Sequence, residues 1–130
     1  MADYIAHFRT NSFQTKDPAA FVDWVATIPG LEAHRSDPER EDTAFTLYCD
    51  GSEPQFTEDD VMIDLSVELA KHLADNEVAI LMEIGHDKLR YLVGTAQAVR
   101  SDGRSLALSL CDIYRMVEKE FGVATNRAEY

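Results

Sequence analysis

Residues 77–100, with the sequence EVAILMEIGHDKLRYLVGTAQAVR, decide the fold of this chain. Apolar side chains alternate through Val78, Ile80, Met82 and Ile84 and again within residues 89–95, and Gly85-His86-Asp87 separates the two runs. This pattern predicts a β-hairpin whose turn is made by residues 85–88. A second turn signal at residues 101–104 makes residues 105–110 a third strand, so this half of the chain is predicted to be an antiparallel meander.

The sequence before the hairpin predicts three more strands and two helices. Residues 4–14 alternate as a strand, residues 17–30 contain a capped amphipathic helix, and residues 31–35 and 43–49 are expected strands joined by a charged turn. Residues 50–60 are rich in acids, Gly and Pro and are expected to form an exposed loop. The next helix is expected to begin between residues 57 and 66 and to end near residue 75, with Leu65, Leu69 and Leu73 facing inward.

The C-terminal part predicts a last helix and completes the order of elements. Residues 111–121 carry an apolar stripe of Ile113, Tyr114, Val117 and Phe121, and Gly122 is placed to end the helix. Residues 123–130 are expected to be a loosely attached tail. The order β-α-β-β-α-β-β-β-α predicts an α+β fold, in which two to three helices pack on one face of a mainly antiparallel sheet of five to six strands. The chain of 130 residues is expected to be one compact domain, residues 1–130.

Nearly all of the net charge of −12 lies in one segment. Residues 32–77 contain fourteen Asp and Glu against three Lys and Arg, whereas residues 1–31 and 78–130 are close to neutral. Residues 37–68 hold eleven acids and one base, Arg40, so ion pairs between neighbours leave most of this charge uncompensated. Two hypotheses follow: a solvated surface that serves only solubility, and a surface that binds a cationic partner.

The second hypothesis predicts a DNA mimic. Duplex DNA carries about one negative charge per 1.7 Å, so a net charge of about −10 matches roughly 17 Å of duplex, or about five base pairs. Such carboxylates would occupy a Lys/Arg groove built for phosphate, with the same steep dependence on salt. Mimicry requires that the carboxylates share one face. The candidate phosphate surrogates are Asp37, Glu39, Glu41, Asp42, Glu53, Glu58, Asp59, Asp60, Asp64 and Glu68.

A different hypothesis is a small enzyme or ligand-binding protein. His7 and Arg9 lie on the polar face of the first strand, Glu83 interrupts an apolar run, and His86 follows it. If these strands are neighbours, Arg9 pairs with Glu83 and a histidine nearby acts as acid or base. The alternative is a solvated sheet face with cross-strand charge pairs.

Other kinds of site have little support. Asp59, Asp60 and Asp64 lack the spacing of an EF-hand, and there is no HxxxH pair, GxGxxG, P-loop or GxSxG motif, so no metal site and no cofactor is expected. Cys49 and Cys111 match no CxxC pattern and are expected to be two buried, reduced thiols.

Localisation and partners are also constrained by the sequence. With neither a signal peptide nor an apolar run long enough to span a membrane, the protein is expected to be cytoplasmic and to bind no membrane. Its acidity argues against direct nucleic-acid binding. A face of one sign also disfavours self-association through that face, so a monomer is expected, with the meander edge and the last helix as the remaining surfaces for a dimer.

Three stretches carry a family resemblance: Arg9-Thr10-Asn11-Ser12-Phe13, the sequence GHDKLRYLVG at residues 85–94, and residues 125–130. Together they resemble a family of small accessory proteins from phages, plasmids and other mobile elements, and the order of elements is similar over most of the chain. The acidic middle is where such proteins differ most. In size and acidity the chain is similar to DNA-mimicking anti-CRISPR proteins, which inhibit type I effector complexes.

The resemblance implies a function without catalysis in a bacterial host cell. The acidic segment would dock into the basic channel of a Cascade-like complex and block the entry of target DNA, and an antirestriction DNA mimic is the second interpretation. The basic residues Arg9, His86, Lys88 and Arg90 do not fit mimicry. They are expected either to be structural, through an Arg9–Glu83 pair and the hairpin turn, or to mark an ancestral ligand or enzymatic site.

Overall fold

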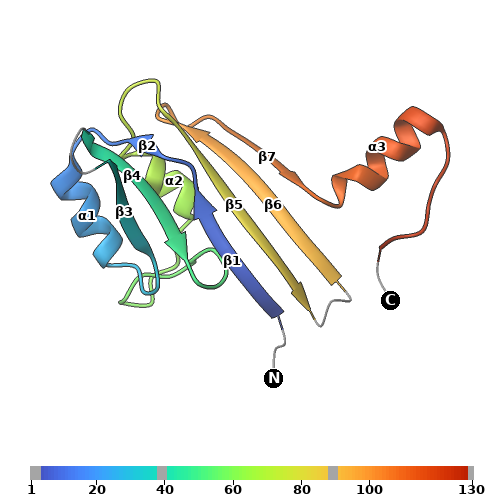
Figure 1. The fold of residues 1–130 in the computed structure, drawn as a ribbon, viewed down its shortest axis with the longest axis horizontal. Coiled ribbons are helices and arrows are strands. Elements are labelled where there is room, and N and C mark those ends of the chain that lie inside the picture. The colour runs from blue at the N-terminus through green and yellow to red at the C-terminus, as the bar shows by residue number, and fades with distance from the viewer. Residues whose placement is uncertain (1–3, 38–40, 88–90, 129–130) are drawn as a thin grey trace.

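The computed structural model describes residues 4–37, 41–87 and 91–128, which form one antiparallel sheet and three helices (Figure 1). The α+β fold is therefore confirmed, with seven strands in place of the five to six expected. The elements are β1 (Tyr4–Thr10), β2 (Phe13–Gln14), α1 (Pro18–Ala26), β3 (Glu32–Asp37), β4 (Glu41–Cys49), α2 (Leu65–Ala70), β5 (Val78–Asp87), β6 (Tyr91–Arg100), β7 (Ser105–Ser109) and α3 (Asp112–Phe121).

The strand order across the sheet is β2-β4-β1-β5-β6-β7, and β3 pairs with β4 outside this path. The strand expected over residues 4–14 is divided in two, because Asn11 interrupts its pairing with β5. The Asn11 Oδ1 accepts a hydrogen bond from the Ile80 N–H (2.8 Å), and its Nδ2 donates one to the Val78 carbonyl (3.3 Å). The side chain thus takes the place of a neighbouring strand, and the chain continues as β2 along β4.

The central hairpin confirms the prediction, but its turn lies further along the chain. β5 and β6 pair without a break from Val78 opposite Arg100 to Asp87 opposite Tyr91. Gly85 therefore lies inside β5, opposite Ala6, and the expectation that it helps to make the turn is wrong. A Cβ at Gly85 would lie 2.6 Å from the Ile5 carbonyl oxygen and 2.7 Å from the Tyr4 hydroxyl, so glycine is required by a close approach of β1. The connecting residues 88–90 lie outside the described residues.

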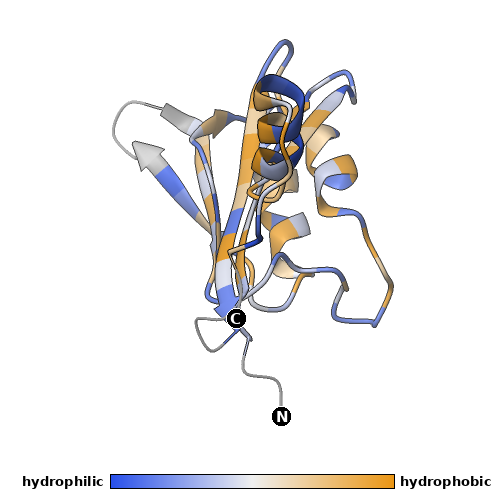
Figure 2. Cartoon of the chain, turned by 90° about the vertical axis from the view of Figure 1, so that its right-hand side faces the viewer, coloured by the Kyte–Doolittle hydropathy of each residue, from blue (hydrophilic) through white to orange (hydrophobic). Residues whose placement is uncertain are grey.

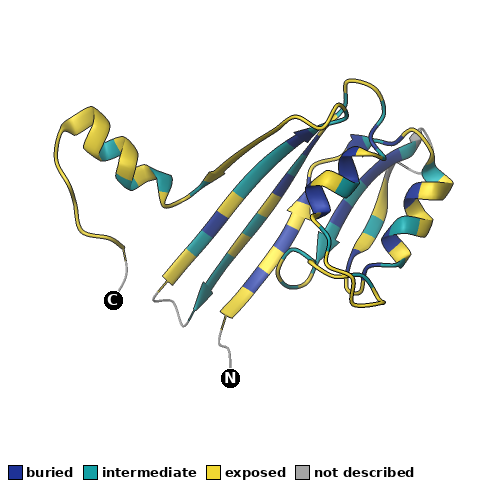
Figure 3. Ribbon diagram, turned by 180° about the vertical axis from the view of Figure 1, so that it is seen from behind, coloured by how far each residue is buried: buried dark blue, intermediate teal, exposed yellow. Residues whose placement is uncertain are grey.

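Helices α1 and α2 cover one face of the sheet, called here the inner face (Figure 3). α1 begins as predicted: Pro18 occupies its first turn, and the Asp17 Oδ1 accepts a hydrogen bond from the Ala20 N–H (3.1 Å). The core contains the α1 residues Phe21 and Val25, the α2 residues Leu65 and Leu69, and the strand residues Phe8, Phe45, Leu47, Leu81 and Val99.

α2 ends at Ala70, earlier than the expected end near residue 75. The chain leaves the helix because the following backbone pairs with the segment after β2: the Lys16 N–H donates to the His72 carbonyl (3.1 Å), and the Ala74 N–H donates to the Gln14 carbonyl (3.0 Å). Leu73 is nevertheless buried, so all three leucines expected to face inward do so.

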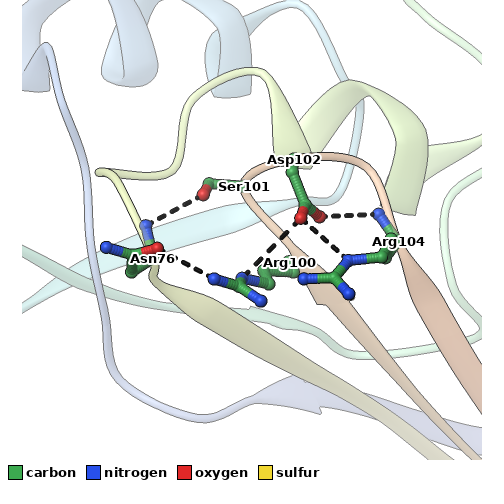
Figure 4. Close-up of polar contacts among 5 residues, drawn as sticks. All are labelled: Asn76, Arg100, Ser101, Asp102 and Arg104. Atoms are coloured by element: carbon green, nitrogen blue, oxygen red, sulfur yellow. Dashed lines mark hydrogen bonds and ion pairs between the residues drawn. The ribbon is translucent and has the colours of Figure 1, made fainter.

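A polar cluster fixes the end of the sheet where β6 turns into β7 (Figure 4). Asp102 accepts hydrogen bonds from the Arg104 N–H (3.0 Å) and Arg104 Nε (2.8 Å), and its carboxylate also pairs with Arg100 (3.8 Å). Arg100 Nη2 donates to the Asn76 Oδ1 (2.8 Å), and the Asn76 N–H donates to the Ser101 hydroxyl (3.0 Å). The Arg104 contacts hold the pKa of Asp102 below its ordinary value, with the backbone hydrogen bond as the largest cause.

The last helix differs from the expectation, because α3 does not pack on the sheet. It lies beyond the end of β7 and apart from α1 and α2 (Figure 1), and none of its residues is buried. Gly122 ends the helix in the left-handed region (φ 74°), as predicted. The following segment contacts α3 itself: the Arg127 guanidinium lies 4.7 Å from the centre of the Tyr114 ring.

We predict that Gly85→Ala lowers the free energy of unfolding by about 1–3 kcal/mol, because the new methyl group meets backbone that cannot move independently. Gly94→Ala is the matched control. Its Cβ would meet the Leu110 side chain at 2.7 Å, but Leu110 is 56% exposed and can rotate away, so the loss is expected to stay below about 1 kcal/mol. Urea unfolding of both variants measures the difference, and equal losses would contradict this account of Gly85.

Candidate functional site

The most concentrated group of exposed carboxylates lies on the loop between β4 and α2. Glu58, Asp59 and Asp60 are consecutive and all exposed. Backbone hydrogen bonds hold this part of the loop as a small hairpin: the Thr57 N–H donates to the Val61 carbonyl (2.9 Å), and the Ile63 N–H donates to the Gln55 carbonyl (2.8 Å). We call residues 57–61 the acidic tip.

The acidic tip is anchored to the body of the protein. The Glu58 N–H donates to the Thr27 carbonyl at the end of α1 (2.7 Å), and Asp60 adopts the left-handed conformation (φ 61°) that closes the turn. Backbone hydrogen bonds therefore hold the acidic tip in place against the end of α1.

The charge of the acidic tip is not neutralised within the protein. In the part of the chain that the structure describes, no Lys, Arg or His side chain pairs with Glu58, Asp59 or Asp60. The acids of the C-terminal half behave differently, since Asp102 pairs with Arg104 (2.8 Å) and Asp112 with Arg115 (3.3 Å). The acids of the tip thus differ from Asp102 and Asp112, whose charge is compensated by a neighbouring arginine.

Three other candidates, Glu53, Asp64 and Glu68, are less available than the carboxylates of the tip. Glu53 is half-buried, and its N–H donates to Glu83 Oε1 (2.6 Å). Burial, followed by the charges of Glu83 and Asp64, raises the pKa of Glu53. The Asp64 Oδ1 accepts a hydrogen bond from the Ser66 hydroxyl (2.8 Å), and Glu68 forms an ion pair with Lys71 (3.1 Å).

The remaining candidates belong to the hairpin of β3 and β4. Asp37 and Glu41 are cross-strand partners at its end, and Asp42 follows in β4. Glu39 lies outside the described residues.

The described candidates fall into two groups along the chain. Glu53, Glu58, Asp59, Asp60, Asp64 and Glu68 lie in the loop after β4 and in α2. Asp37, Glu41 and Asp42 belong to the end of β3 and the start of β4 (Figure 1).

The four residues of the enzymatic hypothesis do not converge. Phe8 is the cross-strand partner of Glu83, so Glu83 lies on the inner face, whereas Arg9 lies on the opposite, outer face with its partner Met82. The expected Arg9–Glu83 pair is therefore wrong. Glu83 instead accepts a hydrogen bond from the Tyr4 hydroxyl (3.0 Å). His86 is paired with Ile5, towards the other end of β1 from Arg9.

His7 and Arg9 instead line an open depression of about 750 Å³ on the outer face of β1, β3 and β4. His7 Nδ1 lies 3.3 Å from Asp50 Oδ1. The ring of Tyr48 stacks on that of His34 (centroids 4.8 Å apart), and a hydrogen bond to Glu32 raises the pKa of Tyr48. Sequence reasoning missed this group, because only the strand register shows that these three strands are neighbours.

Metal and thiol chemistry have no clear site. Within residues 4–37, 41–87 and 91–128, no three His, Cys, Asp or Glu side chains are close enough together to hold a metal ion. Cys49 is half-buried and Cys111 is exposed, so the expectation of two buried thiols is wrong for Cys111. Among the helices described, none is both long and apolar enough to cross a bilayer.

Comparison with protein-family models, with curated proteins and with solved structures gave no match. The candidate site therefore rests on the geometry and charge of this chain.

We predict that Glu53→Gln stabilises the protein at pH 7 by up to about 1 kcal/mol, a limit set by solvent screening of this half-exposed group. A carboxylate whose pKa is raised on folding binds protons more tightly in the folded state, so its contribution to stability falls as pH rises above the ordinary value of 4.5. The gain should therefore disappear below about pH 4. Urea unfolding across this range measures it, with Glu58→Gln at the exposed tip as control. An equal, equally pH-dependent gain in the control would contradict the role of burial.

Proposed function

We propose that this protein is a non-enzymatic inhibitor that uses its two acidic groups to occupy a basic DNA-binding surface of a bacterial defence complex. A Cascade-like CRISPR effector is the first candidate partner, and a restriction enzyme is the second. The observation that carries the proposal is the acidic tip, with three consecutive exposed carboxylates that lack a cationic partner among the described residues.

The anchored geometry of the tip suits such a role. Because backbone hydrogen bonds already hold the tip in one conformation, little conformational entropy is lost when it binds. Acids concentrated in one segment are also better explained by binding than by solubility alone, since solubility does not require charge to be concentrated. The net charge of −12 accelerates encounter with a basic partner and keeps the protein away from nucleic acid.

The acidic tip narrows the mimicry hypothesis to a small contact. Its three consecutive carboxylates would occupy one cluster of phosphate-binding positions on the partner, and not a continuous row of five base pairs. The bacterial cytoplasm is the compartment in which both candidate partners act.

We predict that the triple variant Glu58→Gln, Asp59→Asn, Asp60→Asn weakens inhibition at least tenfold. Its binding should also depend less steeply on salt, with the slope of log K against log salt reduced by about 3, one unit for each lost contact. The measurement is competition between the protein and duplex DNA for a purified type I effector, at two salt concentrations.

The matched control is Asp23→Asn, Asp75→Asn, Glu120→Gln, which removes the same charge from three other exposed positions. If both triple variants lose inhibition equally, net charge and not the tip is responsible. If the wild-type protein binds neither a type I effector nor a restriction enzyme, the proposed function is refuted.

A further inference from the structure

The outer face of β5, β6 and β7 is apolar and is not covered by the described chain. Cross-strand partners share a face, so Met82, Ala96 and Leu108 form one row across these strands, and Ile80, Ala98 and Leu106 form the next. Met82 is 53% exposed, Leu108 61% and Leu106 78%. The alternate residues Leu81 and Val99 are buried in the core, so these positions of β5 and β6 are covered on the inner side and exposed on the outer side.

The sequence of β5 also indicates that both faces are meant to be buried. Residues 78–82 are five consecutive apolar residues, a pattern typical of strands that are covered on both sides. A strand with one face in water normally alternates between apolar and polar residues. Residues 78–82 of β5 do not alternate between apolar and polar side chains. The outer side chains of β5 are nevertheless exposed in the single chain, and Ile84 is 63% exposed.

α3 is an amphipathic helix that also lacks a surface to pack against. Ile113 and Met116 are 51% and 55% exposed, and α3, nearest the viewer in Figure 2, carries apolar as well as charged residues. Burial is low along the whole of β7 and α3 (Figure 3). The Leu110 N–H is still hydrogen-bonded to the Gly94 carbonyl (2.8 Å), and Cys111 alone connects it to α3. Residues 110 and 111 are thus the whole link between β7 and α3, at the short end of the roughly two to six residues that usually connect a strand to a helix.

We propose that the outer face of β5–β7 and α3 together form the interface of a two-fold symmetric dimer, in which α3 of each copy packs on the outer face of the other. Each copy then supplies both the helix and the surface that its partner requires, which is the self-complementarity that a two-fold interface demands. The inference does not depend on the proposed function, and it replaces the monomer expected from the charge of the chain.

The area of the apolar surface agrees with this arrangement. Eight large apolar side chains on the outer face of β5–β7 and on α3 are each at least half exposed, as are Leu110 between β7 and α3 and Val123 after α3. At roughly 60–120 Å² for a fully exposed side chain, they present about 500 Å². One side of a standard interface buries about 800 Å², of which about 60% is apolar, or again about 500 Å².

The distribution of charge favours a second copy over a different partner. Residues 78–130 contain seven acids and seven bases, and Asp102 and Asp112 pair with arginines in this same half. Two copies can therefore approach through this half without bringing uncompensated charges together, although each carries −12 in total. This face has no net charge that would attract a strongly charged partner.

The test is the mass of the full-length protein, measured by sedimentation velocity and light scattering from about 1 to 100 µM. The expected species is a dimer of the 14.6 kDa chain. Met82→Lys and Leu108→Lys on the sheet and Met116→Lys on α3 should each raise the dissociation constant at least tenfold. Val67→Lys on α2 is the control, because Val67 is similarly exposed (52%) but lies on a different element. The dissociation constant of this variant should equal that of the wild-type protein.

A second measurement separates helix exchange from other dimers. Two preparations of a Cys49→Ala chain, labelled at the exposed Cys111 with a donor or an acceptor dye, should show energy transfer when mixed, and Met116→Lys should abolish it. Circular dichroism confirms that each variant is folded, as expected for substitutions at exposed positions. A wild-type protein that stays monomeric at about 100 µM overturns the proposal, as does a dimer that the three lysine variants leave intact.

Discussion

The unbroken pairing of β5 with β6 is the interaction on which the rest of the structure depends. Because the pairs run without a bulge from Val78 to Asp87, the face of every side chain on both strands is determined by its position alone. Leu81 and Val99 are thereby placed under the helices, and Met82 and Ile84 on the opposite side. A slip of one residue would exchange the two sets, and the core would lose its leucine and valine. β1 then aligns on β5, which requires a glycine at residue 85.

Electrostatics divide the molecule into two halves with different properties. In the C-terminal half, acids such as Asp102 and Asp112 have arginine partners, and little field extends into solvent. In the middle of the chain, three exposed carboxylates sit on the acidic tip, which backbone hydrogen bonds hold in place. The apolar outer face and α3 belong to the C-terminal half, whereas the acidic tip belongs to the middle of the chain. A dimer formed through the C-terminal half would leave both acidic tips free to bind a basic partner.

The secondary structure could be predicted from local patterns because those patterns have local causes. The Asp17-Pro18 cap, the alternation in β5 and β6, and Gly122 after α3 each act through residues that are close in sequence. The errors lie where distant chain segments compete for the same backbone groups. Asn11 divides the first strand by bonding to β5, and residues 72–74 leave the helix to pair with the chain after β2. The prediction that Gly85 lies in the turn is wrong, because a glycine is needed there for the close approach of Tyr4 on another strand, which local sequence does not reveal.

The sequence by itself determined the α+β class, the concentration of acids in the middle of the chain and the apolar character of both faces of β5. These properties depend on composition and on short-range periodicity, which need no knowledge of neighbours in space. Only the tertiary structure decided which residues meet. It placed Arg9 and Glu83 on opposite faces, distributed the acidic candidates over the β3–β4 hairpin, the loop after β4 and α2, and left the outer face of β5–β7 and α3 without a covering element among the described residues. The physical reason is that these outcomes follow from strand order and register, which are set by pairing between segments far apart in the chain.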